Sequence, residues 1–398
     1  MHNKKSRMIF LTVYLAYVSI YVARVNLSLA GPELISRNVI NTVQLGILGS
    51  IFSTVYAIGR FLNGNLGDKT PPWLMLTAGL AIAGLSNIFI SFLPPFAGIF
   101  ILWTTNAYAQ SMLWGSVLCV VSSMYEGEEA KRKTSLMVTS VAIGNILAII
   151  LNTYLITKFG VKYAFLVPGV LTTLFGIIVF FSTRNIKHES NTEKKHLSML
   201  KLLQDKELVY MGIPAVMHGV MKENVSLWMT VFVVDKYNVD LSVSSYYILL
   251  IPLIGFVGRI LYPFAYRICH NRENTVSMAG FIVCIASSFV LCIENVGMLF
   301  SVILLGFIYT AASMINTSIL SIYPLEYLET GNVASVSGVM DFATYLGGGV
   351  ASMIYGIVIA SLGYVPMFAS WVVISVISIW VIVKINQRKN KNRRLTIS

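Results

Sequence analysis

The chain has 398 residues, of which 56% are hydrophobic and only 12% are charged. No soluble domain of this length could cover so much apolar surface, so the composition predicts a multi-pass membrane protein. The formal net charge of +12 does not indicate a nucleic-acid partner, because the basic residues lie at the ends of apolar runs, as topology signals do.

Twelve apolar runs are long enough to cross a bilayer as helices. The longest polar stretch, residues 183–209, follows the sixth run. We therefore predict an all-α membrane protein with a six-helix half at 1–182, a linker at 183–209 and a second six-helix half at 210–398. The predicted spans are residues 8–30, 42–65, 73–93, 96–124, 134–157, 163–182, 210–234, 243–264, 275–294, 297–321, 333–360 and 366–385.

The first run, residues 8–30, contains Arg24. A charge in hydrocarbon costs at least about 2.5–3.5 kcal/mol, so such a residue usually faces a water-filled cavity or a partner. Tyr14, Tyr17 and Tyr21 precede Arg24 at helical spacing and share a helix face with it. This face predicts a binding surface for an anion. An arginine that extends to the membrane interface, or that pairs with a buried carboxylate, would also fit this position.

The distribution of Lys and Arg predicts the orientation of the chain, because cytoplasmic segments of membrane proteins are enriched in them. With the N-terminus placed inside, 21 of the 29 basic residues fall in cytoplasmic segments, four in outer loops and four within spans. Both ends of the chain and the linker are therefore predicted to be cytoplasmic, and the protein to lie in the plasma membrane.

An internal repeat relates the two predicted halves. Arg24 and Lys222 are 198 residues apart, and the sequences GRFL at 59–62 and GRIL at 258–261 are 199 apart. Two matches at offsets that differ by one residue suggest a parallel repeat, the architecture of the major facilitator superfamily, in which the ligand site lies between the halves near the midplane. By this offset, Arg24 and Lys222 would face each other across the cavity.

The sequence GNLGDK at residues 64–69 is similar to the loop signature that follows the second span in that superfamily, although residues 71–73 replace its last three positions. The resemblance implies a gate. Gly64 and Gly67 would allow close helix packing, and Asp68 could cap a facing helix N-terminus. An ordinary turn between spans would use the same residue types.

Within the superfamily, the chain resembles the organophosphate:phosphate antiporters, the group of the glycerol-3-phosphate and hexose-phosphate transporters. YVARVNLSLAGP at 21–32 resembles that group's first span, and SGVMDFATYLGGGVA at 337–351 resembles its eleventh. The resemblance implies a substrate site made of basic and tyrosine side chains. These residues are Arg24, Lys222, Arg60, Tyr17, Tyr21, Tyr56, Tyr309 and Tyr345.

The chain departs from the family around its second base. The family usually pairs two arginines, whereas Lys222 here would bind phosphate as a point charge without a planar fork. Glu223 and Asp341 lower the positive charge of the predicted cavity, and they could pair with Lys222 or carry a proton. His218 shares a helix face with Lys222 and could transfer a proton, or it could be a packed structural histidine. A tyrosine that the family has three residues before the base is Gly219 here.

The fourth predicted span carries Trp103, Asn106, Gln110 and Trp114 on one helical face. Aromatic rings and amides together suit a sugar-like ligand, with Gln110 as a binding residue. Hydrogen bonding between helices of the bundle explains the same pattern equally well.

The sequence contains no motif for catalysis or for nucleotide hydrolysis, and its four cysteines lack metal-ligand spacing, so we expect no enzyme, cofactor or metal. We predict a monomeric secondary active transporter in the lipid bilayer that exchanges a small organic phosphate for inorganic phosphate by alternating access. A proton-coupled transporter of organic or sugar acids is one alternative. A transporter-like membrane sensor of phosphate esters is another.

The topology prediction can be checked with an impermeant thiol reagent added to intact cells. A cysteine introduced at Ser190 should resist labelling, because the linker is predicted to be cytoplasmic, whereas one at Asn238 should react. The parent chain without either added cysteine gives the background. Labelling at Ser190 and protection at Asn238 would invert the orientation.

Overall fold

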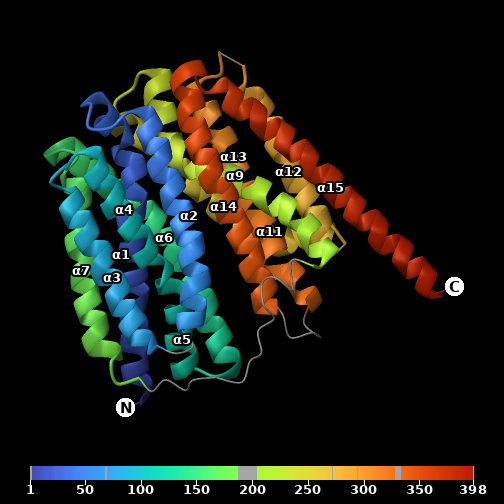
Figure 1. The fold of residues 1–398 in the computed structure, drawn as a ribbon, viewed down its shortest axis with the longest axis horizontal. Helices are drawn as coiled ribbons and strands as arrows, with labels where there is room; N and C mark the ends of the chain where they lie inside the picture. Colours follow the sequence, from blue (N-terminus) through green and yellow to red (C-terminus); the bar gives the residue numbers. More distant parts are fainter. Residues whose placement is uncertain are drawn as a thin grey trace. The chain divides into compact units, whose positions relative to one another are not determined.

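Helices are the only regular secondary structure in the part of the chain that the structure describes, which confirms the predicted all-α class (Figure 1). This computed structural model describes residues 2–67, 70–186, 204–270, 272–293, 295–327 and 333–397. The helices form two units. Unit 1 contains Met1–Lys194 and Thr230–Leu249, and unit 2 contains Lys195–Met229 and Leu250–Ser398.

Unit 1 holds the first predicted half and a short part of the second. Its apolar segments are helical because backbone amides in hydrocarbon must find their hydrogen-bond partners within the same segment. Prolines precede two of the helices, at Pro71 and Pro95, and Gly160 ends a third with a φ of +102° that suits glycine. The helices are α1 (His2–Ser36), α2 (Thr42–Gly67), α3 (Pro72–Ile90), α4 (Phe96–Ser111), α5 (Leu113–Met124), α6 (Gly127–Phe159), α7 (Tyr163–Thr183), the last residues of α9 (Lys206–Tyr237), and α10 (Leu241–Ile248).

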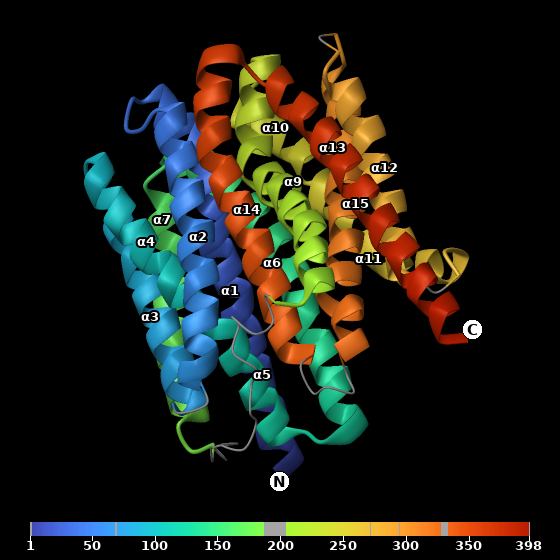
Figure 2. The same ribbon diagram turned by 45° about the vertical axis from the view of Figure 1, so that its right-hand side comes forward.

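Unit 2 holds most of α9 and the helices that follow α10. In it, α12 packs against both α13 and α15, and the three helices lie side by side (Figure 2). The elements after α10 are α11 (Leu250–Ile268), α12 (Glu273–Leu291), α13 (Met298–Thr317), the π-helix η1 (Ser318–Ile322), the 3-10 helix η2 (Tyr323–Tyr327), α14 (Val333–Leu362) and α15 (Val365–Ile397).

The π-helix η1 follows directly on α13 and is tied to two other helices of unit 2. The hydroxyls of Tyr262 on α11 and Ser318 in η1 are 3.0 Å apart. Ser337 on α14 donates a hydrogen bond to the carbonyl of Leu320 at 2.7 Å. These bonds satisfy polar groups in a segment where the usual helical pattern changes.

Ten helices among the described residues are long and apolar enough to cross a membrane, by length and composition alone. Two predicted spans are not among these ten. The span predicted at 96–124 is divided at Met112 into α4 and α5, of 16 and 12 residues. The span predicted at 210–234 lies within α9, whose apolar character is reduced by His218, Lys222 and Glu223. Both segments are helical, and the number of spans that cross the bilayer stays a prediction.

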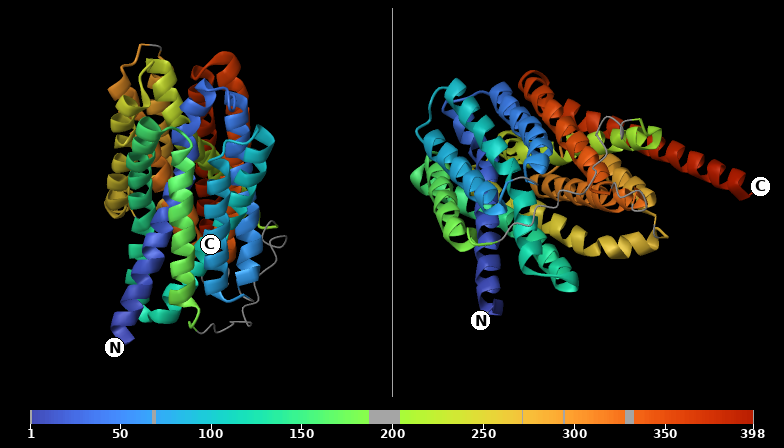
Figure 3. Two further views of the ribbon diagram at one scale, coloured as in Figure 1. Left: turned by 90° about the vertical axis from the view of Figure 1, so that its left-hand side faces the viewer. Right: turned by 60° about the horizontal axis from the view of Figure 1, so that its bottom comes forward.

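Small residues allow close helix packing in unit 1. Helix α7 lies beside α1 and packs against α3 as well (Figures 1 and 3). Where α3 and α7 cross, a Cβ added to Gly84 would lie 2.7 Å from the carbonyl oxygen of Gly169. A Cβ added to Gly169 would lie 2.8 Å from the carbonyl oxygen of Gly84. Both positions therefore require glycine for the observed approach of the two backbones.

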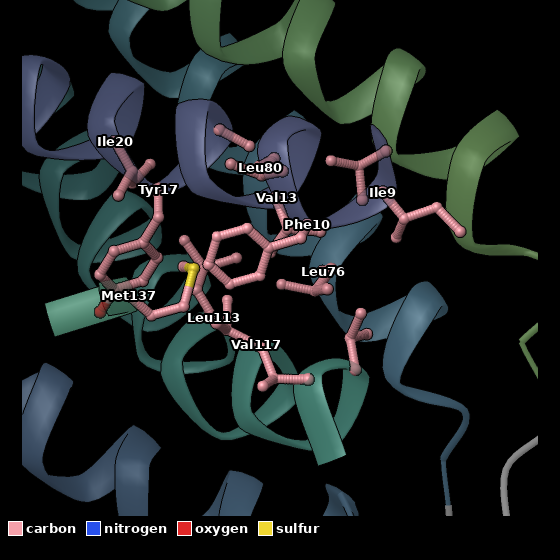
Figure 4. Packing of buried hydrophobic residues seen from close by; sticks show 14 of the residues in the cluster. Ile9, Phe10, Val13, Tyr17, Ile20, Leu76, Leu80, Leu113, Val117 and Met137 are labelled. Carbon is pink, nitrogen blue, oxygen red and sulfur yellow. The ribbon is translucent and has the colours of Figure 1, made fainter. Parts of the chain in front are cut away.

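The hydrophobic core of unit 1 lies where α1 meets α3, α5 and α6. Figure 4 shows Phe10 and Val13 of α1 among side chains from these helices. Tyr17 belongs to the same cluster and is only 6% exposed. A predicted binding residue is therefore also part of the core. Other labelled members are Ile9, Ile20, Leu76, Leu80, Leu113, Val117 and Met137.

Gly84→Ala should lower the free energy of unfolding by about 1–3 kcal/mol, because the added methyl group overpacks the crossing of α3 and α7. Thermal unfolding in detergent micelles would measure the loss. Gly115→Ala is the matched control, since a Cβ there meets nothing within 4 Å. Equal melting temperatures for the two variants would contradict the packing argument.

Candidate functional site

The predicted base of the first span, Arg24, lies on α1 among three aromatic rings. Its guanidinium carbon is 5.6 Å from the ring centre of Tyr21, 4.8 Å from that of Phe52 and 4.6 Å from that of Tyr56. The rings of Phe52 and Tyr56 come from α2 and stack with their centres 6.0 Å apart. Aromatic faces attract a cation without neutralising it, so these rings can position the guanidinium while its charge is retained.

Tyr17 and Arg60 lie next to this group. The ring centre of Tyr17 is 5.6 Å from that of Tyr21 and 5.3 Å from that of Trp114. The guanidinium of Arg60 is 5.9 Å from the ring centre of Tyr56. The structure therefore brings together the predicted substrate-binding residues of the first two spans. They are Tyr17, Tyr21, Arg24, Tyr56 and Arg60.

Phe52 belongs to this site but was not predicted from the sequence. Its ring contacts Arg24, and its centre is also 5.4 Å from that of Trp103 on α4. Phe52 lies four residues before Tyr56, so helical spacing places both rings on one face of α2. That spacing is the signal that could have identified it.

The predicted binding residue Gln110 belongs to a buried network of amides. It is 3% exposed, and its Nε2 donates to Asn106 Oδ1 at 3.1 Å. Asn87 Nδ2 reaches the same oxygen at 3.5 Å, and Asn26 Nδ2 donates to Asn87 Oδ1 at 2.8 Å. The network joins α1, α3 and α4, and it has the geometry of hydrogen bonding between helices. A contact between Gln110 and a substrate stays a prediction.

In unit 2, the predicted base Lys222 lies on α9 and forms an ion pair with its neighbour. Its Nζ is 3.1 Å from Oε1 of Glu223 and 5.3 Å from the ring centre of Tyr345 on α14. Tyr309 on α13 and Asp341 on α14 are close enough to act electrostatically on Lys222. The structure thus gathers the predicted residues of the second half around this one ammonium group.

His218 lies one turn before Lys222 on α9 and is fully buried. Neither ring nitrogen makes a hydrogen bond of normal geometry to the residues that the structure describes. The carbonyl of Ala312 on α13 is near enough to act on the ring, as is the charge of Lys222. His218 therefore lies beside Lys222, as its predicted coupling role requires. The role itself stays a prediction.

Glycines bring α14 close to α9 at this place. A Cβ added to Gly219 would overlap the carbonyl of Thr344, and one added to Gly348 would lie 2.6 Å from Cγ of Glu223. The structure has no room for a tyrosine at position 219. This departure from the family pattern therefore accompanies the close approach of α14, the helix that carries Asp341 and Tyr345.

The predicted gate residues are only partly described. Gly64 and Gly67 lie in the last turn of α2, and Asp68 lies outside the described residues. Their gating role stays a prediction. Among the residues in the described ranges, no three or more His, Cys, Asp and Glu side chains gather in a group that could hold a metal ion.

Comparison with known proteins supplies an independent line of evidence. Residues 13–352 match the family model described as Major Facilitator Superfamily. The chain is 29% identical over 177 residues to a probable hexose phosphate transport protein of Chlamydia trachomatis, a match that covers 44% of this chain and 39% of the relative. It is 21% identical over 279 residues to the membrane sensor protein UhpC of Escherichia coli, covering 64% of this chain and 63% of the relative. The matches thus span less than two thirds of the length of either relative.

Solved structures show the same fold. A bacterial homologue of the human lysosomal transporter Spinster, in an inward-facing and unoccupied conformation, has a TM-score of 0.75 at 13% identity, covering 96% of this chain and 95% of that chain. The nucleoside transporter NupG has a TM-score of 0.74 at 12% identity, covering 95% and 98%. At such low identity these likenesses concern the fold alone.

The amide network generates a stability prediction. Asn87→Leu should lower the free energy of unfolding by about 1–3 kcal/mol, because Asn26 and Asn106 then lose a buried partner. Thermal unfolding in detergent micelles would measure this. Thr105→Val serves as the control, since this exposed hydroxyl donates only to the carbonyl of Ile101 in its own helix. Unchanged stability in Asn87→Leu would show that the network contributes nothing.

Proposed function

The chain belongs to the major facilitator superfamily, and on this premise we propose that it is a secondary active transporter of a small organic anion. We propose that the anion is an organic phosphate ester, exchanged for inorganic phosphate across the plasma membrane by alternating access. Twelve spans, cytoplasmic ends, a parallel pair of six-helix halves and a monomeric state are parts of the same proposal.

The observation that carries the proposal is the setting of Arg24. A guanidinium group presents a planar fork of donors that matches two oxygens of a phosphate group. The rings of Phe52 and Tyr56 lie against this group at 4.8 and 4.6 Å and restrict its orientation. Arg60 adds a second positive charge beside the same tyrosine. Together they form a basic, aromatic surface suited to an oxyanion.

Lys222 is the second base of the proposal. Its support is the offset of 198 residues from Arg24 and the gathering of Tyr309 and Tyr345 around it, both of which the family resemblance implies as binding residues. The relative named as a probable hexose phosphate transport protein supports a phosphate ester as the transported anion.

An exchanger must change between its outward and inward states mainly when a substrate is bound. Basic side chains that repel each other oppose the closing of an empty site around them, because closure removes the water that screens them. A bound anion offsets this repulsion. The anion can then shift the equilibrium between the outward and inward states by the difference in its affinity for them.

Two other functions have specific support. Glu223, Asp341 and His218 near Lys222 favour a proton-coupled transporter of organic or sugar acids, because each of these groups can bind a proton. The similarity to the membrane sensor protein UhpC favours a transporter-like sensor of phosphate esters. Measured uptake separates a carrier from a sensor, and a panel of phosphate esters and sugar acids separates the two kinds of carrier.

Arg24→Ala should abolish phosphate counterflow in liposomes loaded with phosphate while the protein remains folded. The reason is the loss of the charge and fork that bind the anion. Arg24→Lys should recover little of the activity, because lysine lacks the fork. Uptake of labelled phosphate against the loaded liposomes measures the effect.

Arg37→Ala is the matched control for this experiment. Arg37 is exposed and pairs with Glu33 at 2.6 Å, in the turn that directly follows α1, the helix of Arg24. It should exchange phosphate at the wild-type rate. Normal counterflow by Arg24→Ala would refute the anion site.

A further inference from the structure

Resting on the proposed function, we propose that Glu223 is a built-in counter-anion of Lys222 that makes this base select singly charged oxyanions over doubly charged ones. Glu223 would thereby be a specificity-determining residue. The proposal starts from the ion pair between the two neighbours, in which Nζ and Oε1 are 3.1 Å apart.

The pair depends on packing by another helix. Adjacent residues of a helix point in different directions and do not normally meet. Here the side chain of Glu223 lies against α14, where Gly348 has no side chain and leaves space for its methylene groups. On the same helix, Tyr345 places its ring 5.3 Å from Nζ of Lys222. Helix α14 therefore confines both partners.

The charges around Lys222 are mostly negative. Asp341 from α14 acts on it together with Glu223, while Tyr309 from α13 and Tyr345 contribute neutral phenols. His218 is a further titratable neighbour, one turn away on α9. Two carboxylates thus act on one ammonium group, Glu223 within the ion pair and Asp341 more weakly. An anion that reaches Lys222 is attracted by one charge and repelled by two, and the repulsion grows with the charge of the anion.

The pair is less buried than its neighbour His218. The side chains of Lys222 and Glu223 are 19% and 17% exposed, whereas His218 is fully buried. An arriving oxyanion can therefore take the place of the Glu223 carboxylate at Nζ. A singly charged anion does so with less repulsion from Asp341 and from the displaced carboxylate.

The test compares two phosphate probes that differ mainly in charge. At pH 8, methyl phosphate is a dianion and dimethyl phosphate a monoanion. Each probe competes with labelled inorganic phosphate for binding to the purified full chain. The wild type should bind dimethyl phosphate more tightly than methyl phosphate. Glu223→Gln should raise the affinity for methyl phosphate by about ten-fold or more, the scale of removing one like charge at close range. It should change the affinity for dimethyl phosphate far less.

Two variants serve as controls. Glu223→Asp keeps the carboxylate and should keep the preference for the monoanion. Glu33→Gln removes the carboxylate of the surface pair with Arg37, at the end of α1, and should leave both affinities unchanged. Thermal unfolding of each variant reports whether it is folded.

Several results would overturn the inference. A wild-type preference for methyl phosphate would do so even if Glu223→Gln failed to fold. Equal changes for the two probes in Glu223→Gln would also do so. If phosphate binds the wild type but not Arg24→Ala, the proposed anion site stands. Either of these two results then counts only against the role of Glu223. If phosphate and both probes fail to bind the wild type, whereas the sugar acid glycerate binds, the proposed function itself fails.

Discussion

Polar groups inside this helical protein must find partners within the protein, because the surrounding hydrocarbon supplies none. Three solutions appear in the described structure. Arg24 lies against the faces of aromatic rings, Lys222 pairs with a carboxylate, and a set of amides bonds across three helices. Small residues also matter for the second of these, since Gly348 leaves space for the side chain of Glu223. The contacts of the candidate site thus follow from the same need for internal partners that acts on polar groups along the whole chain.

The two bases meet this constraint in different ways, and the difference has functional weight. Rings around Arg24 position a charge without cancelling it. The carboxylate beside Lys222 compensates its charge directly. The pairing with Glu223 moderates the attraction of Lys222 for an oxyanion. Lys222 and Glu223 therefore act together on the electrostatics of this part of unit 2.

Much of the candidate site could be predicted from the sequence, because the spacing of residues along a helix determines which of them are neighbours. Tyr21 and Arg24 are three residues apart on one helix, so their contact follows from the helix itself. Tyr56 and Tyr345 came from the family resemblance. Phe52 was not predicted, because an apolar residue in an apolar run does not differ from its neighbours. Its spacing of four residues from Tyr56 was the available signal.

Other features depend on long-range contacts that no local pattern reveals. Met112 separates α4 from α5 within a predicted span, although its backbone stays in the helical region, with φ −72° and ψ −21°, and methionine favours helices. The π-helix η1 is tied by Tyr262 and Ser337, which come from two distant parts of the chain. The structural role of Gln110 was one of two predicted alternatives, and its partner Asn106 was on the predicted face. The remaining links to Asn87 and Asn26 required the fold.

The ion pair of Lys222 and Glu223 has a consequence for the energetics of a moving carrier. Both partners belong to one helix and are confined by α14 of the same unit, so their attraction is the same in every arrangement that keeps α9 and α14 packed together. An interaction of equal strength in two states cannot favour either of them. Ion pairs between different helices break and form as such a protein changes conformation, and they contribute to its barriers. The pair of Lys222 and Glu223 contributes the same free energy to each such state. The desolvation of its two charges costs free energy only once, during folding.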